Sequence, residues 1–316
     1  MGKEQPIVCI GGANVDKKLY AKDEIAFNTS NPVTSSASVG GVARNIAENL
    51  GRLGEEVVLL TVRGDDAEWY EIEKASAPFM DTTYVHKVPG AATGSYTAVL
   101  DKQGDMAVAY ADMDVFDSLT AKLLVENTEL LRNAKCIVVD LNCPEETVYF
   151  LSSFASVHEI PLAVIPVSSP KMKRLPERME SIDWIIVNKE ETETFFKMRI
   201  DSEESWKLSV ERWLARGVRN VVVTNGAEGV IIGTADEIRH MPTLMANDVV
   251  DATGAGDSFC AGVLYAWIQG DPFTEVVQAG LVNSRKTVQS RHTVRKDLTP
   301  HQFKQDREEF IDGTLS

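Results

Sequence analysis

Long apolar runs are missing from this chain of 316 residues. No stretch approaches the ~20 consecutive apolar residues that a membrane-spanning helix requires, so we expect no membrane partner. The first residues lead directly into a strand-like apolar run at Ile7–Ile10, and no secretory leader is evident. We therefore expect a cytoplasmic protein.

Cysteine is scarce, with four in the chain, and their spacing matches no metal-binding pattern. Three of the four lie in or beside apolar runs, which indicates buried, reduced thiols of an intracellular protein. The five histidines are equally scattered. We assign no metal to any of them.

Basic residues are in deficit, since 32 Lys and Arg stand against 47 Asp and Glu and give a net charge of −15. Phosphate backbones are bound by clustered Lys and Arg, so the sequence argues against nucleic acid as a partner. We interpret the acidity as a contribution to solubility. Hydrophobic residues make up 44% of the chain, enough for the core of one large domain.

Short apolar runs alternate with helical patterns along the chain. Strands that are apolar throughout, alternating with helices, are typical of a parallel sheet covered on both faces. Ligands of such folds bind at the carboxyl ends of the strands. We predict strands at 7–10, 57–62, 136–141, 162–166, 184–187 and 221–224, and helices at 45–53, 120–133, 144–158, 190–196 and 203–216.

Two stretches, residues 16–39 and 88–112, break this alternation and have the pattern of short antiparallel strands. They are similar in kind, although they are separated in sequence. We predict that they pair into one small sheet that covers the site as a lid and excludes water. The alternative is two unrelated surface hairpins.

The most informative stretch is Gly254-Ala255-Gly256-Asp257, which precedes an apolar run typical of a helix. Free backbone N–H groups at a helix N-terminus, beside small side chains only, form an anion pocket. An aspartate there would repel an anion, but it suits a base that removes a proton from a hydroxyl attacking a phosphoryl group. The alternative is a glycine-rich turn with Asp257 as an ordinary N-cap.

Two further polar groups lie near predicted strand ends. Asn14 and Asp16 are two apart in an extended segment, and therefore on one face, where they could bind neighbouring hydroxyls or simply end a strand. Gly40 and Gly41 would let the backbone approach a ligand closely. Asn45 lies in the first turn of the following helix, where it could point into the site or cap the helix.

Three other sets of residues each allow two interpretations. Arg44 could bind phosphate or lie in solvent at the helix start. Asn188 and Glu191 could face one cavity and hold hydrated magnesium, or they could form a capping box. Thr224 and Gly226 could donate hydrogen bonds to phosphate oxygens or belong to an ordinary turn.

The chain resembles the ribokinase-like, pfkB-type family of carbohydrate and nucleoside kinases through five motifs in order: G-G-A-N-V-D, V-G-G-V-A-R-N, N-K-E-E, T-N-G-A-E-G and D-A-T-G-A-G-D. The resemblance runs from about Ile7 to about Gln289. It implies a three-layer α/β fold, in which helices flank a mainly parallel sheet, as one domain over residues 1–316 with a β-sheet lid. It also implies transfer of the γ-phosphoryl group of ATP to a sugar hydroxymethyl group.

The resemblance implies a role for each motif. Asp257 would be the catalytic base, and the amides of Gly254, Ala255 and Gly256 the anion hole. The substrate would be held by Asn14, Asp16, Gly40, Gly41 and Asn45. The nucleotide would be contacted by Asn188, Thr224, Gly226 and Asn283. Mg²⁺ would be organised through water by Asn188 and Glu191, and K⁺, which many members bind, would be held by Asp251 and Thr253. Lid sheets of this family can pair across subunits, so a homodimer through the lid stays open.

Departures from the family pattern concern the substrate. Asn142 stands where ribokinases place a glutamate that helps to hold ribose, and an amide can donate as well as accept. Residues 30–32 and 110–114 resemble the pseudouridine kinases, which phosphorylate the 5′-hydroxyl of a C-nucleoside. In this interpretation Asp112 and Ser95 would contact the base or the ribose.

Three alternatives remain beside a pseudouridine kinase. The first is a family member that acts on ribose, fructose, a keto-deoxy sugar acid or a purine nucleoside. The second is a sugar-sensing protein on the same fold, against which the presence of Asp257 counts, because a sensor needs no base. The third, a dinucleotide-dependent dehydrogenase, lacks the G-x-G-x-x-G spacing after the first strand.

Overall fold

The main sheet has eight strands, in the spatial order β14-β13-β12-β11-β10-β9-β1-β4. The structure is a computed structural model that describes residues 5–243 and 248–315. Residues 1–4, on which the expectation of no secretory leader partly rests, lie outside the described residues. The strands are β1 (Ile7–Ile10), β4 (Val57–Leu60), β9 (Cys136–Asp140), β10 (Leu162–Ile165), β11 (Trp184–Asn188), β12 (Asn220–Thr224), β13 (Val230–Gly233) and β14 (Ile238–Met241). The six strands β12, β11, β10, β9, β1 and β4 pair in parallel with their neighbours. Strand β13 pairs antiparallel with β12, and β14 pairs antiparallel with β13.

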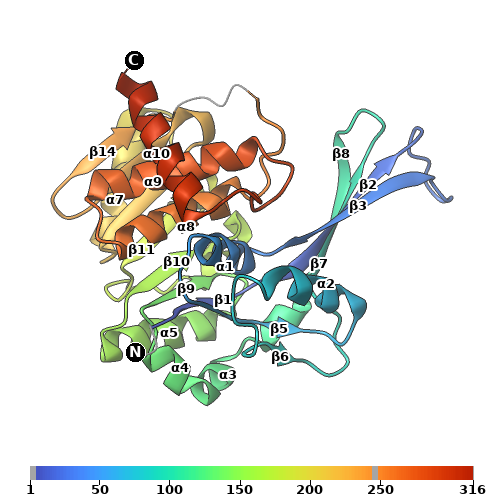
Figure 1. Cartoon of the computed structure of the whole chain (residues 1–316), viewed down its shortest axis with the longest axis horizontal. Helices are drawn as coiled ribbons and strands as arrows, with labels where there is room; N and C mark the ends of the chain where they lie inside the picture. The colour runs from blue at the N-terminus through green and yellow to red at the C-terminus, as the bar shows by residue number, and fades with distance from the viewer. Residues whose placement is uncertain (1–4, 244–247, 316) are drawn as a thin grey trace.

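Helices cover both faces of the main sheet, because its central strands are apolar on both sides. In β1, Ile7 and Cys9 belong to one buried cluster and Val8 and Ile10 to the other. The helices are α1 (Val42–Arg52), α2 (Ala67–Ser76), α3 (Ala121–Glu126), α4 (Thr128–Arg132), α5 (Glu145–His158), α6 (Lys189–Phe196), α7 (Glu203–Ala215), α8 (Ala255–Ile268), α9 (Phe273–Val288) and α10 (Pro300–Leu315). The predicted three-layer α/β fold is confirmed (Figure 1).

One predicted helix, 120–133, is two helices in the structure. Helix α3 ends and α4 begins at Asn127, whose side-chain amide donates to the Leu123 carbonyl at 2.9 Å. Asparagine side chains compete in this way for backbone partners, which disfavours a continuous helix. Short 3₁₀ helices complete the chain at η1 (Asp114–Ser118), η2 (Ser169–Arg174) and η3 (Gly226–Glu228).

A separate four-stranded sheet has the order β3-β2-β7-β8. Its strands are β2 (Asn14–Ala21), β3 (Val33–Gly40), β7 (Ser95–Leu100) and β8 (Met106–Asp112), and it extends from the body as an arm (Figure 1). Parallel pairing of β2 with β7 joins the two stretches of the chain, so they are not unrelated hairpins. A two-stranded sheet, β5 (Val62–Arg63) with β6 (His86–Lys87), lies beside them.

The register of the central strands brings their carboxyl ends to one edge. Ile10 pairs with Leu60 on one side and with Val139 on the other. The chain leaves β1 for β4 on one side, and later returns to β9 on the other, so the strand order reverses at β1. Ligands of open α/β sheets bind outside the carboxyl ends of the strands at such a reversal.

Candidate active site

Asp140, at the carboxyl end of β9, organises the loops at this edge. Its Oδ2 accepts hydrogen bonds from the backbone N–H groups of Gly12 and Ala43, each at 2.9 Å, and its Oδ1 accepts one from the N–H of Asn142 at 2.8 Å. A Cβ atom on Gly11 would lie 2.2 Å from the Asp140 Cγ. Gly11 and Gly12 therefore leave room for this buried carboxylate.

Asp140 was not among the residues that the sequence pointed to. Its signal was available, since a charged residue ends an otherwise apolar and fully buried strand. Burial raises the pKa of the Asp140 carboxyl, and the backbone hydrogen bonds from Gly12, Asn142 and Ala43 oppose that rise.

The predicted substrate-binding residues Asn14, Asp16, Gly40 and Gly41 come together near Asp140. Asn14 Nδ2 donates to Asp16 Oδ1 at 2.7 Å, and a Cβ on Gly40 would lie 2.1 Å from Asp16 Oδ2. Gly41, with φ of 103°, precedes α1, and a Cβ there would lie 2.3 Å from the Gly12 carbonyl oxygen. The two glycines thus let the loops close around the Asp16 carboxylate.

Asn45 and Asp257 meet although they are 212 positions apart. The Asn45 Nδ2 donates to Asp257 Oδ2 at 2.8 Å. Burial raises the pKa of Asp257 to about 7; the Asn45 hydrogen bond lowers it, and the negative charges of Asp140 and Asp16 raise it. A base is most effective when its pKa lies near the working pH.

Asp257 lies in the first turn of α8, which begins after Gly254. The Ser258 N–H donates to the Gly254 carbonyl at 2.9 Å, and the Ala255 N–H of the predicted anion hole already donates to the Ala252 carbonyl at 3.2 Å. The backbone N–H groups of Gly254 and Gly256 donate to no carbonyl within the described residues, so these two can face an anion. Gly254 has φ of 81°, and a Cβ there would lie 2.2 Å from the Thr293 carbonyl oxygen. A Cβ on Gly256 would meet nothing within 4 Å, because this side of the turn faces a cavity.

That cavity, of about 390 Å³, lies beside the start of α8. It brings together the predicted Ala255, Gly256, Thr224 and Gly226. Helix α9 contributes residues that the sequence did not single out, with helical spacing: Leu281, Ser284, Arg285 and Val288. An i, i+3, i+4, i+7 pattern beside Asn283 would have indicated this face.

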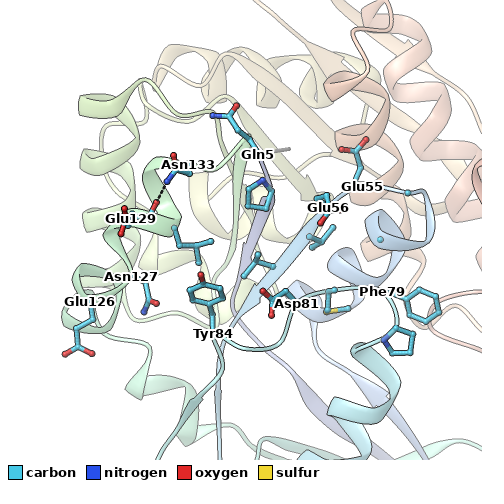
Figure 2. Close-up of a pocket in the computed structure, with 18 residues that line it drawn as sticks. Gln5, Glu55, Glu56, Phe79, Asp81, Tyr84, Glu126, Asn127, Glu129 and Asn133 are labelled. Atoms are coloured by element: carbon cyan, nitrogen blue, oxygen red, sulfur yellow. Dashed lines mark hydrogen bonds between the residues drawn. The ribbon is translucent and has the colours of Figure 1, made fainter. Parts of the chain in front are cut away.

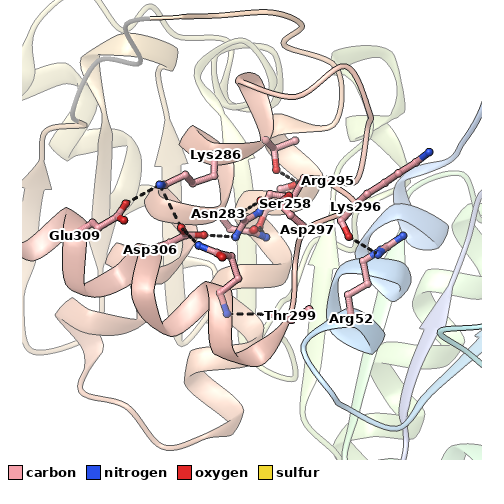
Figure 3. Close-up of polar contacts among 12 residues, drawn as sticks. Arg52, Ser258, Asn283, Lys286, Arg295, Lys296, Asp297, Thr299, Asp306 and Glu309 are labelled. Carbon is pink, nitrogen blue, oxygen red and sulfur yellow. Dashed lines mark hydrogen bonds and ion pairs between the residues drawn. The ribbon is translucent and has the colours of Figure 1, made fainter.

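Asn283 itself does not line the cavity, and its predicted contact with the nucleotide is corrected here. The side chain is fully buried and donates to Asn49 Oδ1 at 3.0 Å and to the Ser258 carbonyl at 2.8 Å (Figure 3). It joins α9 to α1 and α8, because it points to the opposite side of α9 from the cavity-lining residues.

Asn188 and Glu191 form a capping box at the start of α6. The Asn188 side chain accepts from the Glu191 N–H, and the Glu191 carboxylate accepts from the Asn188 N–H, each at 2.8 Å. The capping box that the sequence offered as the alternative to a magnesium site is therefore present. Burial raises the pKa of the Glu191 carboxyl. Within the described residues, no three acidic, His or Cys side chains converge on a possible metal site.

The Asp251 carboxylate accepts three hydrogen bonds from two residues of the protein. It accepts from the Thr253 N–H at 2.9 Å and hydroxyl at 2.6 Å, and from Lys18 Nζ at 2.9 Å. Lys18 lies two residues after Asp16 on β2, so this face of the four-stranded sheet reaches the loop before α8.

Ser95 and Asp112 lie on the other face of that sheet. Strand register pairs Asp16 with Tyr96, whereas Ser95 pairs with Val15 and Asp112. Successive side chains alternate between faces, so the structure does not bring Ser95 or Asp112 to Asp16. Tyr96, which the sequence did not single out, shares the face of Asp16.

Asn142 is buried beside Gly12 and bonds with Lys171 of η2. The Lys171 Nζ donates to Asn142 Oδ1, and the side-chain amide of Asn142 also hydrogen-bonds to Asp140, which leaves one N–H of Nδ2 for a ligand. Arg174 Nη1 holds the same loop, donating to the Asn142 carbonyl at 2.7 Å. The sequence did not identify Lys171, although basic residues after a strand are conspicuous in an acidic chain.

A larger cavity, of about 1010 Å³, lies at the opposite edge of the sheet (Figure 2). Its lining includes Pro6 and Val57, beside or at the amino ends of β1 and β4, and an acidic rim with Glu56 and Asp81. This is not the edge at which parallel sheets bind their ligands.

The four cysteines are free and buried, as expected. Within the described residues, no helix has the length and apolarity to span a membrane.

Known proteins match the whole chain. The pfkB family of carbohydrate kinases matches residues 4–299. The chain is 31% identical over 303 residues to a pseudouridine kinase of Escherichia coli (strain K12), with 95% of each chain covered. A carbohydrate kinase from Agrobacterium tumefaciens has 29% identity, a TM-score of 0.81 and 96% and 97% coverage. The Arabidopsis thaliana ribokinase, solved with ribose and ATP, has 20% identity, a TM-score of 0.85 and 96% and 99% coverage.

In this chain the Asp257 carboxylate lies at a helix N-terminus, where it bonds with Asn45, and its neighbour Gly256 lines the cavity beside α8. The chain therefore belongs to the pfkB family of carbohydrate kinases and is a phosphotransferase that acts on a hydroxyl group of a sugar or nucleoside.

Proposed function

We propose that the protein transfers the γ-phosphoryl group of ATP to the 5′-hydroxyl of pseudouridine. The observation that carries the transfer is the position of Asp257. Its carboxylate contacts Asn45 on the side of Asp16, while its neighbour Gly256 lines the cavity with Thr224. An acceptor hydroxyl and a phosphoryl donor could therefore meet at one carboxylate.

In this mechanism Asp257 accepts the proton of the 5′-hydroxyl as its oxygen attacks the γ-phosphorus. The new O–P bond forms in line with the bond to the β-phosphate oxygen, which breaks and leaves ADP. The backbone N–H groups of Gly254 and Gly256 would stabilise charge on the transferring group. Asp16 and Asn14 would hold the ribose hydroxyls. The four-stranded sheet, which Lys18 connects to Asp251 in the loop before α8, would act as a lid.

Two metal ions belong to this proposal. Mg²⁺ would neutralise charge on the phosphates. Because Glu191 is buried and bonded to the backbone of Asn188, these residues fit Mg²⁺ only through water and the phosphates of ATP. K⁺ at Asp251 and Thr253 would share the carboxylate with Lys18.

Pseudouridine as acceptor is supported by the similarity to the Escherichia coli pseudouridine kinase and by Asn142. Lys171 donates to the side-chain oxygen of Asn142, so this part of the site presents an amide N–H and an ammonium group. Donors suit the carbonyl oxygens of a pyrimidine base better than a glutamate would. We also propose a cytoplasmic location and a homodimer through the exposed apolar side chains of the lid, which include Val33 and Tyr110.

The test is ADP release with a panel of acceptors: pseudouridine, uridine, ribose, fructose, a keto-deoxy sugar acid and a purine nucleoside. The highest kcat/KM is expected with pseudouridine. A higher value for another acceptor would replace the substrate and keep the kinase. No turnover with any acceptor would favour the sugar-sensing protein.

Replacing Asn142 by glutamate is expected to shift preference from pseudouridine toward ribose, by about tenfold or more in the ratio of kcat/KM values. The carboxylate removes the amide donor and would pair with Lys171. The ratio is measured with both acceptors in parallel. An unchanged ratio would remove Asn142 from the basis of specificity.

The turnover number is expected to rise with pH up to a plateau above pH 7. Burial raises the pKa of Asp257 to about 7, and only the deprotonated carboxylate can accept the proton. Below that pKa, kcat should fall by about tenfold per pH unit. The measurement is kcat against pH at saturating acceptor and MgATP. A flat profile across pH 5 to 8 is the contrary result.

A further inference from the structure

Arg44 lies beneath the site with each arm of its guanidinium bonded. It is 3% exposed, so it is not a solvated helix-start residue, nor does it line the nucleotide cavity. Its Nη1 donates to Asn45 Oδ1 at 3.0 Å and its Nε to Ser76 Oγ at 3.2 Å, while its Nη2 pairs with Glu48. Each of the three nitrogens of the planar group thus makes a hydrogen bond, which fixes its position.

This contact determines which way the Asn45 amide faces. A guanidinium has donors only, so the atom of Asn45 that faces Arg44 must be the oxygen. The Asn45 Nδ2 must then point to the other side, where it donates to Asp257 Oδ2 at 2.8 Å. Without Arg44, nothing on the far side would hold the amide oxygen, which could then turn to accept a hydrogen bond from the protonated form of Asp257 and so favour that form.

We propose that Arg44 is a positioning residue for phosphoryl transfer: its guanidinium fixes the Asn45 amide, and this amide orients the Asp257 carboxylate and favours its ionised form. The proposal rests on the proposed function, in which Asp257 is the base. It assigns to the arginine of the G-G-V-A-R-N motif a role through Asn45 rather than through contact with phosphate.

The charges that face Asp257 come from three elements. Asp140 of β9 and Asp16 of β2 raise the pKa of Asp257, whereas Arg44 of α1 lowers it. Loss of the Arg44 charge should therefore make Asp257 harder to ionise. The contact with Asn45 and the charge act in the same direction, because both stabilise the carboxylate.

Arg52 offers a matched control on the same helix. Its Nε donates to Glu48 Oε1 at 2.8 Å, from the side opposite Arg44, and its Nη1 donates to the Lys296 carbonyl at 3.2 Å (Figure 3). Arg52 makes no hydrogen bond to Asn45 or Asp257 within the described part of the chain. Replacing it removes an ion pair with Glu48 but leaves the amide in place.

The experiment measures kcat, KM and the pH profile of Arg44→Met, Arg44→Lys and Arg52→Met in the full chain, with the unfolding temperature of each. For Arg44→Met we expect at least a tenfold lower kcat at pH 7 and a small change in KM. The acidic limb of its profile of kcat against pH should move to higher pH by about half a unit or more. Arg52→Met should lose stability and keep the wild-type limb.

Arg44→Lys keeps the positive charge but loses the fork that fixes Asn45. We expect its kcat to be reduced and its acidic limb to move by less than that of Arg44→Met, so this variant supports the proposal even where Arg44→Met does not fold. Wild-type kcat and limb in any folded Arg44 variant would overturn it, as would an equal limb shift in Arg52→Met. If instead Asp257→Asn turned over normally, the proposed function itself would fail.

Discussion

Replacing Asp257 by asparagine is expected to lower kcat by about 10²–10⁴-fold, the range over which a general base contributes. The amide has the shape of the carboxylate but cannot accept the proton of the acceptor hydroxyl. Its oxygen can still accept the hydrogen bond from Asn45, so the KM for the acceptor should change little. Steady-state ADP release with saturating MgATP measures both constants.

Two further expected results distinguish the loss of the base from a loss of folding. The unfolding temperature should stay near or above that of the wild type, because the variant no longer buries a carboxylate whose pKa burial raises to about 7. The acidic limb of the kcat profile should also disappear. Turnover near the wild-type level would contradict the role of Asp257 as the base.

Replacing Asp140 by asparagine is expected to lower the free energy of unfolding by about 1–3 kcal/mol, the penalty for one buried polar group without a partner. The carboxylate accepts on both oxygens, from Gly12 and Ala43 on one and from Asn142 on the other. An amide has one acceptor oxygen, so its NH₂ group must face at least one backbone N–H. The loops would shift, and a shift of ~1 Å in the site can reduce kcat/KM by about 10²-fold.

Asp183 provides the control for this effect. It is a buried aspartate that accepts from the Leu162 N–H at 2.9 Å and pairs with Arg219, but it precedes β11, at the amino edge of the sheet. Asp183→Asn should also reduce the free energy of unfolding, measured by urea denaturation, and should leave kcat/KM unchanged. Equal losses of kcat/KM in both variants would show that destabilisation alone explains the result for Asp140.

Local sequence signals predicted the elements that carry the site. Glycines before a helical run indicated the N-terminus of α8, because left-handed φ angles and open N–H groups are local properties. Asn14 and Asp16 were placed on one face by the period of a strand, and they are hydrogen-bonded in the structure. The alternation of apolar runs predicted the parallel sheet, although it did not predict the break at Asn127.

Errors arose where a residue's direction depends on its neighbours in space. Asn283 lies in α9 as the motif order suggests, but it faces α1 and α8 rather than the cavity. The register also places Ser95 and Asp112 on the sheet face opposite Asp16, while their contact with the base or ribose stays a prediction. A shift of one position reverses the face of a strand residue, and sequence patterns fix boundaries less tightly than that.

The sequence by itself determined the fold class and the family and singled out Asp257 as the candidate base, because periodicity, glycine positions and motif order are properties of short segments. Only the tertiary structure decided which groups act on that aspartate. Gly12 and Asp140 are 128 positions apart and Asn45 and Asp257 are 212 apart, and they meet because parallel strands end at one edge of the sheet. The pKa of Asp257, and the burial of Arg44 beneath Asn45, follow from that convergence.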